Sequence, residues 1–209
     1  MKKILILMVC VCTSVIATAQ TKVTWGVEAG VGFSSWMGEG ASHSDALFNP
    51  RVGVSVDVPL TGLVSFQTGL DYESKGAQYK IGGYDVTVDQ NYLRMPLLAA
   101  FHLGTTANFD VVVRGGAYLA CGISGKNNVE DGDLTYSWST FKDLDFPSSD
   151  PNVTETLKGF HRFDAGFQVG AALDFTRWTV GMDAEFGLCR IQRDGPRNLS
   201  LFVGVGYKF

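Results

Sequence analysis

Apolar and polar residues alternate along most of the chain, with the period of two that is typical of β-strands. The last segment, Leu199–Phe209, shows this most clearly, because every second residue from Leu199 onward is apolar. Seven earlier segments follow the same alternation: 23–36, 50–58, 64–74, 91–103, 109–124, 162–173 and 178–189. The pattern predicts eight strands, each with one apolar face.

Charged residues are confined to the other face of these segments. No Asp, Glu, Lys or Arg falls on the apolar face, whereas the opposite face carries charges of both signs. If the strands close into a narrow barrel, these side chains meet in the lumen, where unpaired charges would be unfavourable. We therefore predict a lumen network of paired acids and bases, made of Glu28, Arg51, Asp71, Glu73, Arg94, Arg114, Asp164, Asp183 and Glu185.

Strand length and connection length decide between a soluble sheet and a membrane barrel. Several segments reach the ~9–11 residues of a tilted membrane strand, beyond the ~5–6 that are usual in soluble sheets. Short connections (59–63, 104–108, 174–177) alternate with longer ones (37–49, 75–90, 125–161, 190–198). This fits short periplasmic turns and long external loops. The predicted fold is all-β, an eight-stranded antiparallel up-and-down transmembrane β-barrel; a soluble periplasmic barrel stays open as an alternative.

The N-terminal residues predict export. Lys2 and Lys3 precede an apolar stretch from Ile4 to Ile16, and Ala17-Thr18-Ala19 forms a small-x-small cleavage site. This is the pattern of a secretory signal peptide, over residues 1–19, followed by one barrel domain over residues 20–209. The apolar run is shorter than the ~20 residues of a membrane-spanning helix, which disfavours an anchor.

Composition narrows the chemistry. The 209 residues carry a formal net charge of −4, with no basic run, so nucleic acid is not an expected partner. After the signal peptide, two cysteines remain: Cys121 is predicted on the lipid face and Cys189 on the inner face of a strand two positions away. Strands are ~4.8 Å apart, so these residues lie beyond the reach of a disulfide. We predict two free thiols.

Several short motifs carry a family resemblance. Asn91-Tyr92-Leu93-Arg94-Met95-Pro96-Leu97-Leu98, Gly115-Gly116-Ala117-Tyr118-Leu119, the segment 163–171 (F-D-A-G-F-Q-V-G-A) and the ending 205–209 (V-G-Y-K-F) resemble, in order and spacing, motifs of the PorT-like outer-membrane β-barrel family of Gram-negative bacteria. The resemblance implies an eight-stranded barrel in the outer membrane and, for the family's namesake, a part in protein secretion. It also implies that the terminal aromatics, Tyr207 and Phe209, serve as a signal to the barrel-insertion machinery.

The long external segment 125–161 is the candidate binding loop. It contains the aromatic residues Tyr136, Trp138, Phe141 and Phe146 among aspartates and serines. Long loops with aromatic residues are commonly used for binding. We therefore expect a non-enzymatic structural or interaction role through the external loops, such as an accessory of protein secretion or envelope assembly.

Two other functions remain as alternatives. An uninterrupted lumen would make a small passive channel, although an eight-stranded barrel is only wide enough for its own side chains. A hydrolase at the rim would use His43 or His161, but no G-x-S-x-G motif accompanies them. The sequence predicts no cofactor and no metal site. The expected partners are outer-membrane lipid, the insertion machinery and secretion or envelope proteins.

Overall fold

The computed structural model describes residues 23–39, 41, 44–81, 84–104, 108–131, 134–147, 154–192 and 195–209. The predicted signal peptide, residues 1–19, lies outside this range, as does His43. The strands are β1 (Thr24–Met37), β2 (Ser44–Asp45), β3 (Leu47–Pro59), β4 (Val64–Ile81), β5 (Tyr84–Gly104), β6 (Asp110–Asp131), β7 (Leu134–Ser139), β8 (Leu144–Pro147), β9 (Thr154–Leu157), β10 (Phe163–Asp174), β11 (Trp178–Arg190) and β12 (Arg197–Lys208). No helix among the described residues has the length and apolar character needed to cross a membrane.

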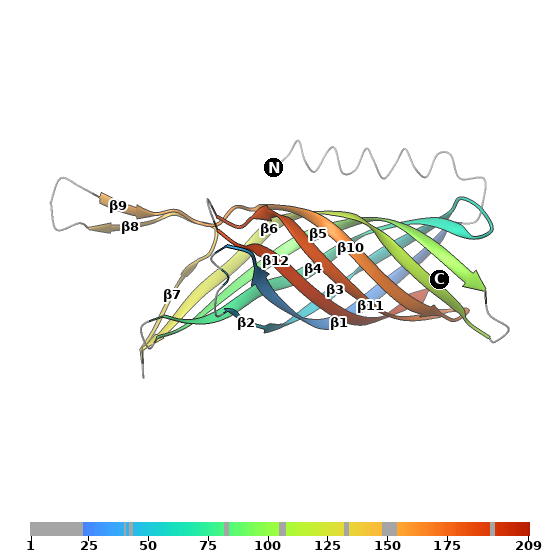
Figure 1. Cartoon of the computed structure of the whole chain (residues 1–209), viewed down its shortest axis with the longest axis horizontal. Helices are drawn as coiled ribbons and strands as arrows, with labels where there is room; N and C mark the ends of the chain where they lie inside the picture. Colours follow the sequence, from blue (N-terminus) through green and yellow to red (C-terminus); the bar gives the residue numbers. More distant parts are fainter. Residues whose placement is uncertain are drawn as a thin grey trace.

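Eight of these strands form a closed antiparallel ring. The order is β10-β11-β12-β1-β3-β4-β5-β6, and β6 returns to pair with β10 over Phe163–Asp174, which closes the barrel (Figure 1). Each strand therefore pairs with two neighbours, so no edge of the described ring is left open. The predicted eight-stranded antiparallel barrel is confirmed.

The two faces of the ring differ as the alternation predicts. Along β12, Phe202 and Ser200 point inward and are buried, whereas Leu201 and Val203 point outward and are half exposed. The same pattern runs through β1 and β11, so aliphatic and aromatic side chains form an outer belt around a polar interior. Such an inverted distribution is stable only when the outer face meets lipid rather than water.

The connections differ in length between the two ends of the barrel. The short connections follow β3, β5 and β10, and these three strands end where β1 begins and β12 ends. We call this the periplasmic end, following the usual arrangement of such barrels, and the opposite end the outer end.

Strands β4, β5 and β6 extend beyond the barrel at its outer end. They contain 18, 21 and 22 residues, well beyond the ~9–11 that cross a membrane. Their prolonged parts pair with one another, with β2 and with β7, while β8 and β9 form a separate hairpin (Figure 1). The predicted loop over 75–90 is therefore wrong: residues 75–81 and 84–90 are strand. Much of the predicted loop over 125–161 is also strand.

Candidate functional site in the barrel lumen

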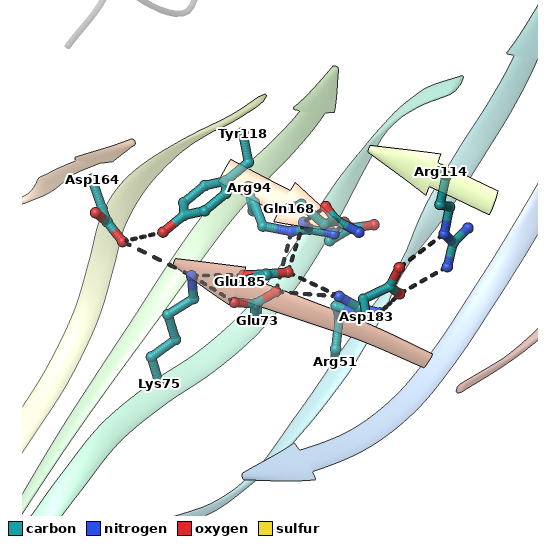
Figure 2. Close-up of polar contacts among 11 residues, drawn as sticks. Arg51, Glu73, Lys75, Arg94, Arg114, Tyr118, Asp164, Gln168, Asp183 and Glu185 are labelled. Atoms are coloured by element: carbon teal, nitrogen blue, oxygen red, sulfur yellow. Dashed lines mark hydrogen bonds and ion pairs between the residues drawn. The ribbon is translucent and has the colours of Figure 1, made fainter. Parts of the chain in front are cut away.

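A cluster of ion pairs around Glu185 crosses the lumen of the barrel. Glu185, on β11, is buried and accepts hydrogen bonds from Arg51 Nη1 at 3.1 Å and from Lys75 Nζ at 2.9 Å. Arg94 Nη1 lies 2.8 Å from Oε1, the same oxygen that accepts from Arg51 (Figure 2). Three cations from strands β3, β4 and β5 thus meet on one carboxylate from the opposite wall. Because these strands are not neighbours of β11 in the ring, the contacts cross the lumen.

Glu73 and Asp71 extend the cluster on β4. Glu73 lies 3.0 Å from Lys75 Nζ and 3.1 Å from Arg94 Nε, and its distance to Arg51 Nη1 is 3.8 Å. Asp71 accepts a hydrogen bond from Arg94 Nη2 at 2.5 Å. Arg94 therefore uses all three of its nitrogens inside the lumen, since Nη1 also donates to Gln168 Oε1 at 2.6 Å.

Asp183 joins the periplasmic side of the network. Its carboxylate accepts two hydrogen bonds from Arg114, both at 2.8 Å, in the bidentate geometry that favours Arg over Lys. Arg51 Nη2 donates to the same carboxylate at 2.8 Å. Arg51 consequently bridges Asp183 and Glu185 on β11.

Asp164 joins the network on the outer side. It accepts hydrogen bonds from Tyr118 OH and Asn198 Nδ2, each at 3.2 Å, and lies 3.8 Å from Lys75 Nζ. The ammonium of Lys75 also sits 4.3 Å from the centre of the Tyr118 ring, within cation–π range.

The structure brings together eight of the nine residues predicted for the network. Glu28 is the exception: it is half-buried and lines the hollow on the periplasmic side, and none of the ion pairs in the described part of the chain includes it. Sequence reasoning missed four members, Lys75, Tyr118, Gln168 and Asn198. Lys75 and Asn198 were assigned to loops, whereas Tyr118 and Gln168 are uncharged residues on the inner face of predicted strands, where the alternation could have found them.

Glycines on the inner face make room for these long side chains. A Cβ atom at Gly53 would collide with the carboxylate of Asp71, and one at Gly170 would collide with that of Asp183. Four cations and five carboxylates can therefore pack across the barrel. The arrangement is a cross-brace that ties β3, β4, β5, β6, β10 and β11 together.

An aromatic layer lies above the network at the outer end. Phe141 is buried against Tyr92, with ring centres 5.9 Å apart, and the guanidinium of Arg162 covers its ring at 5.0 Å. Gly122 lies directly beneath, and a Cβ there would come within 2.9 Å of three Phe141 ring carbons. Phe141 lies in the connection between β7 and β8, in line with the predicted loop, but its side chain is buried at the mouth of the barrel and is not exposed for binding.

The periplasmic side of the network is hollow. The cavity there has a volume of about 60 Å³ and is lined by Asp71, Arg114 and Lys208 among others. This volume has room for a few water molecules, since one water needs roughly 10–15 Å³. The hollow ends at Arg51 and Arg94, so the lumen is blocked near its middle.

Ser65, His102 and Asp57 lie together at the periplasmic end. His102 Nε2 is 2.8 Å from Ser65 Oγ, but Asp57 lies on the same side, 3.8 Å from Nε2, and accepts the Ser65 hydroxyl at 3.1 Å. A catalytic triad needs the carboxylate on the other ring nitrogen and a reachable hydroxyl. Ser65 is only 2% exposed, so the trio does not have the geometry of a triad.

The remaining predicted residues lie near the two ends. Tyr136 and Trp138 share one face of β7 rather than a loop, and Tyr136 is 59% exposed. Phe146 belongs to β8, with its side chain outside the described set. Tyr207 packs against Trp178 and Phe209 at 5.0 and 5.5 Å, and the Phe209 amide donates to the Trp25 carbonyl at 2.9 Å.

Both cysteines in the described strands are free thiols, as the strand register predicted. Cys121 lies between inward-facing Ala120 and Gly122, and therefore faces outward. Among the described residues, no group of three His, Cys, Asp or Glu side chains is arranged to hold a metal ion.

Comparison with known proteins identifies the family. The family model described as "Outer membrane protein beta-barrel domain" matches residues 18–192, most of the chain. The chain belongs to this outer-membrane β-barrel family. Its place is accordingly the outer membrane, and the aliphatic belt is its lipid-facing surface. The match does not extend to the finer PorT-like grouping.

Solved structures share the fold at low identity. Neisserial surface protein A has a TM-score of 0.51 and 15% identity, over 90% of this chain and all of that one. A major outer membrane protein from Thermus thermophilus has a TM-score of 0.52 and 12% identity over the same shares. No curated protein sequence matches the chain significantly. The structural likeness supports the fold alone.

Proposed function

We propose that this protein is a closed, non-enzymatic outer-membrane barrel that presents an ordered external β-sheet to a protein partner of the secretion or envelope-assembly machinery. The observation that carries the proposal is the length of β4, β5 and β6, whose outer parts continue as paired strands well beyond the membrane. Paired strands of this kind hold side chains in fixed positions, which a mobile loop would not.

The closed lumen supports a role outside the barrel rather than through it. The ion-pair network and the Phe141 layer both cross the path that a solute would take. Breaking the network would leave buried charges unpaired, at a cost of several kcal/mol. The second function considered, a small passive channel, has no feature of the described lumen in its favour.

The outer tip of the external sheet exposes aromatic side chains, with Tyr136 at 59% and Tyr84 at 42%. Tyr136 lies opposite Val129, which lies opposite Val86, so the three form one row across β7, β6 and β5. Trp138 lies in the next row, on the same face of β7 as Tyr136. Trp138 is half-buried, and Val86 on the same face is only 8% exposed, so the accessible part of this face is its tip around Tyr136 and Tyr84. Tyr and Trp side chains are enriched at the centres of protein interfaces. β7 also has one unpaired edge in the described sheet, along which a partner strand could add.

Crosslinking in intact cells tests the proposal. A photoreactive residue replaces Tyr84, which is 42% exposed and two residues before Val86, on the same face of β5. Crosslinked proteins are purified and identified in the wild-type background and in the Tyr136→Ala/Trp138→Ala variant. We expect one envelope or secretion component in the wild-type background and at least a tenfold loss in the variant.

The matched control is Thr135→Ala, which changes the opposite face of the same strand. It should retain the crosslink. Crosslinks to lipid alone, or equal yields from all three proteins, would contradict the proposal. Heat-shifted migration on gels confirms that each variant is folded.

A further inference from the structure

The external sheet ends in an open edge on β7. In an antiparallel ladder, successive residues turn their backbone groups alternately to one side of the strand and to the other. The Thr140 amide, just past β7, donates to the Gly125 carbonyl on β6 at 3.2 Å, so Thr135 and Ser137 turn their N–H and C=O groups away from β6. Within the described part of the chain, β7 is the last strand in the sheet order, and no strand pairs with this side of it.

This edge lacks the features that usually keep sheet edges from pairing. Natural sheets protect an exposed edge with lysine, with proline or with a bulge. β7 reads L-T-Y-S-W-S, without a charge or a proline, and its six pairs with β6 run without a register shift. Thr135, Tyr136 and Ser137 are exposed. The edge is therefore regular, uncharged and accessible to another strand.

The sequence of β7 is complementary to a second copy that runs in the opposite direction. Two identical edges related by a two-fold axis pair antiparallel. With the axis at Ser137, Tyr136 of each copy lies opposite Trp138 of the other, in the positions where cross-strand side chains come closest. Aromatic pairs at such positions stabilise a sheet, and residues 134–140 bring no charge against a like charge. These features favour a second copy of the chain as the occupant of the edge.

The position of β7 determines how the two barrels would face each other. The ring pairing of β6 ends at Cys121, whereas β7 pairs with residues 126–131 at the outer tip of β6 (Figure 1). The tip is about ten residues beyond the ring, or roughly 30 Å along the strand. A two-fold axis perpendicular to the sheet reverses the direction of the strands and of the barrel below them. The second barrel therefore lies in a membrane that faces the first.

We propose that the free edge of β7 pairs antiparallel with the same edge of a second copy in an opposed outer membrane, so that the protein joins neighbouring cells. One pairing of six residues is a small interface, at the weak end of the range for specific contacts. Two membranes carry many copies, and their contacts add through multivalency. This inference goes beyond the proposed envelope partner and does not rest on it.

Vesicle clustering tests the contact in the absence of any other protein. The purified protein is reconstituted into lipid vesicles with two fluorescent labels, and mixed clusters are counted. We expect wild-type vesicles to cluster with one another and not with protein-free vesicles. Ser137→Pro removes the N–H group at the centre of the pairing and should lower clustering by about fivefold or more. The matched control Ser137→Ala keeps this N–H group and should cluster as the wild type does.

Opposite charges at the same position test both the register and the identity of the partner. Because Ser137 lies opposite itself in the proposed pair, Ser137→Lys vesicles and Ser137→Glu vesicles should each fail to cluster alone. When the two are mixed, they should cluster with each other. No clustering of the wild type, attachment to protein-free vesicles, full clustering of Ser137→Pro or no recovery in the mixture would overturn the proposal. Heat-shifted migration on gels shows that each variant is folded.

Discussion

Replacing Glu185 by Gln tests whether the lumen network braces the barrel. The side chain keeps its shape but loses the charge on which Arg51, Lys75 and Arg94 converge, at 3.1, 2.9 and 2.8 Å. Hydrogen bonds to charged groups contribute about 1.5–3 kcal/mol each, so three contacts set an upper range of roughly 4.5–9 kcal/mol. Glu73 contacts the same three cations and compensates for part of the loss. We expect the free energy of unfolding to fall by about 3–5 kcal/mol, as for other broken buried ion pairs.

Urea unfolding in lipid vesicles, followed by tryptophan fluorescence, measures this change. Glu130→Gln is the control, because Glu130 is exposed on the external part of β6 and should change the free energy of unfolding by less than about 0.5 kcal/mol. The double variant Glu185→Gln/Lys75→Met also removes the ammonium that lost one of its carboxylate partners. The two changes should therefore be non-additive by at least about 1 kcal/mol. A loss below about 1 kcal/mol for Glu185→Gln, or strict additivity, would refute the bracing role.

Three further changes test other parts of the structure. Gly122→Ala places a Cβ against the Phe141 ring and should displace the ring. We expect the free energy of unfolding to fall by about 1–3 kcal/mol and protease to cleave the segment after β7 faster. The control Gly62→Ala adds its Cβ in open space and should change neither quantity. Phe209→Ala should lower the amount of assembled barrel in cells several-fold, as measured by heat-shifted migration on gels. Refolding in vitro should change little, because the Phe209 side chain is 74% exposed and its backbone hydrogen bond to Trp25 remains. Peptide mass spectrometry without reductant should find Cys121 and Cys189 unlinked, and a bridge between them would show that the strand register is wrong.

The fold was predictable because the membrane imposes a strict pattern on sequence. A lipid-facing residue such as Val203 must be apolar and its neighbour Phe202 must fill the lumen, so the period of two is visible without any tertiary information. The inward charges could be found in the same way, since Arg94 and Asp183 occupy alternate positions in clear strands.

The outer end was not predictable to the same degree. Near the outer end of β4 and β5 the sequence neighbours of inward residues are no longer apolar, so the alternation stops at Lys75 and Gln90 although both side chains are buried. The strands were expected to end at the membrane, which placed Lys75 in a loop. Its ion pairs with Glu73 and Glu185 were therefore not predicted. The inward position of Phe141 depends on the space above Gly122, which no local pattern encodes.

Planar-bilayer recording of the purified protein tests the central claim, a closed lumen, most directly. The ion pairs around Glu185 and the Phe141 layer predict a flat current without single-channel steps at moderate voltages. Steady, uniform steps from the folded wild-type protein would contradict the account, because they would require a continuous water path through residues that the structure packs together.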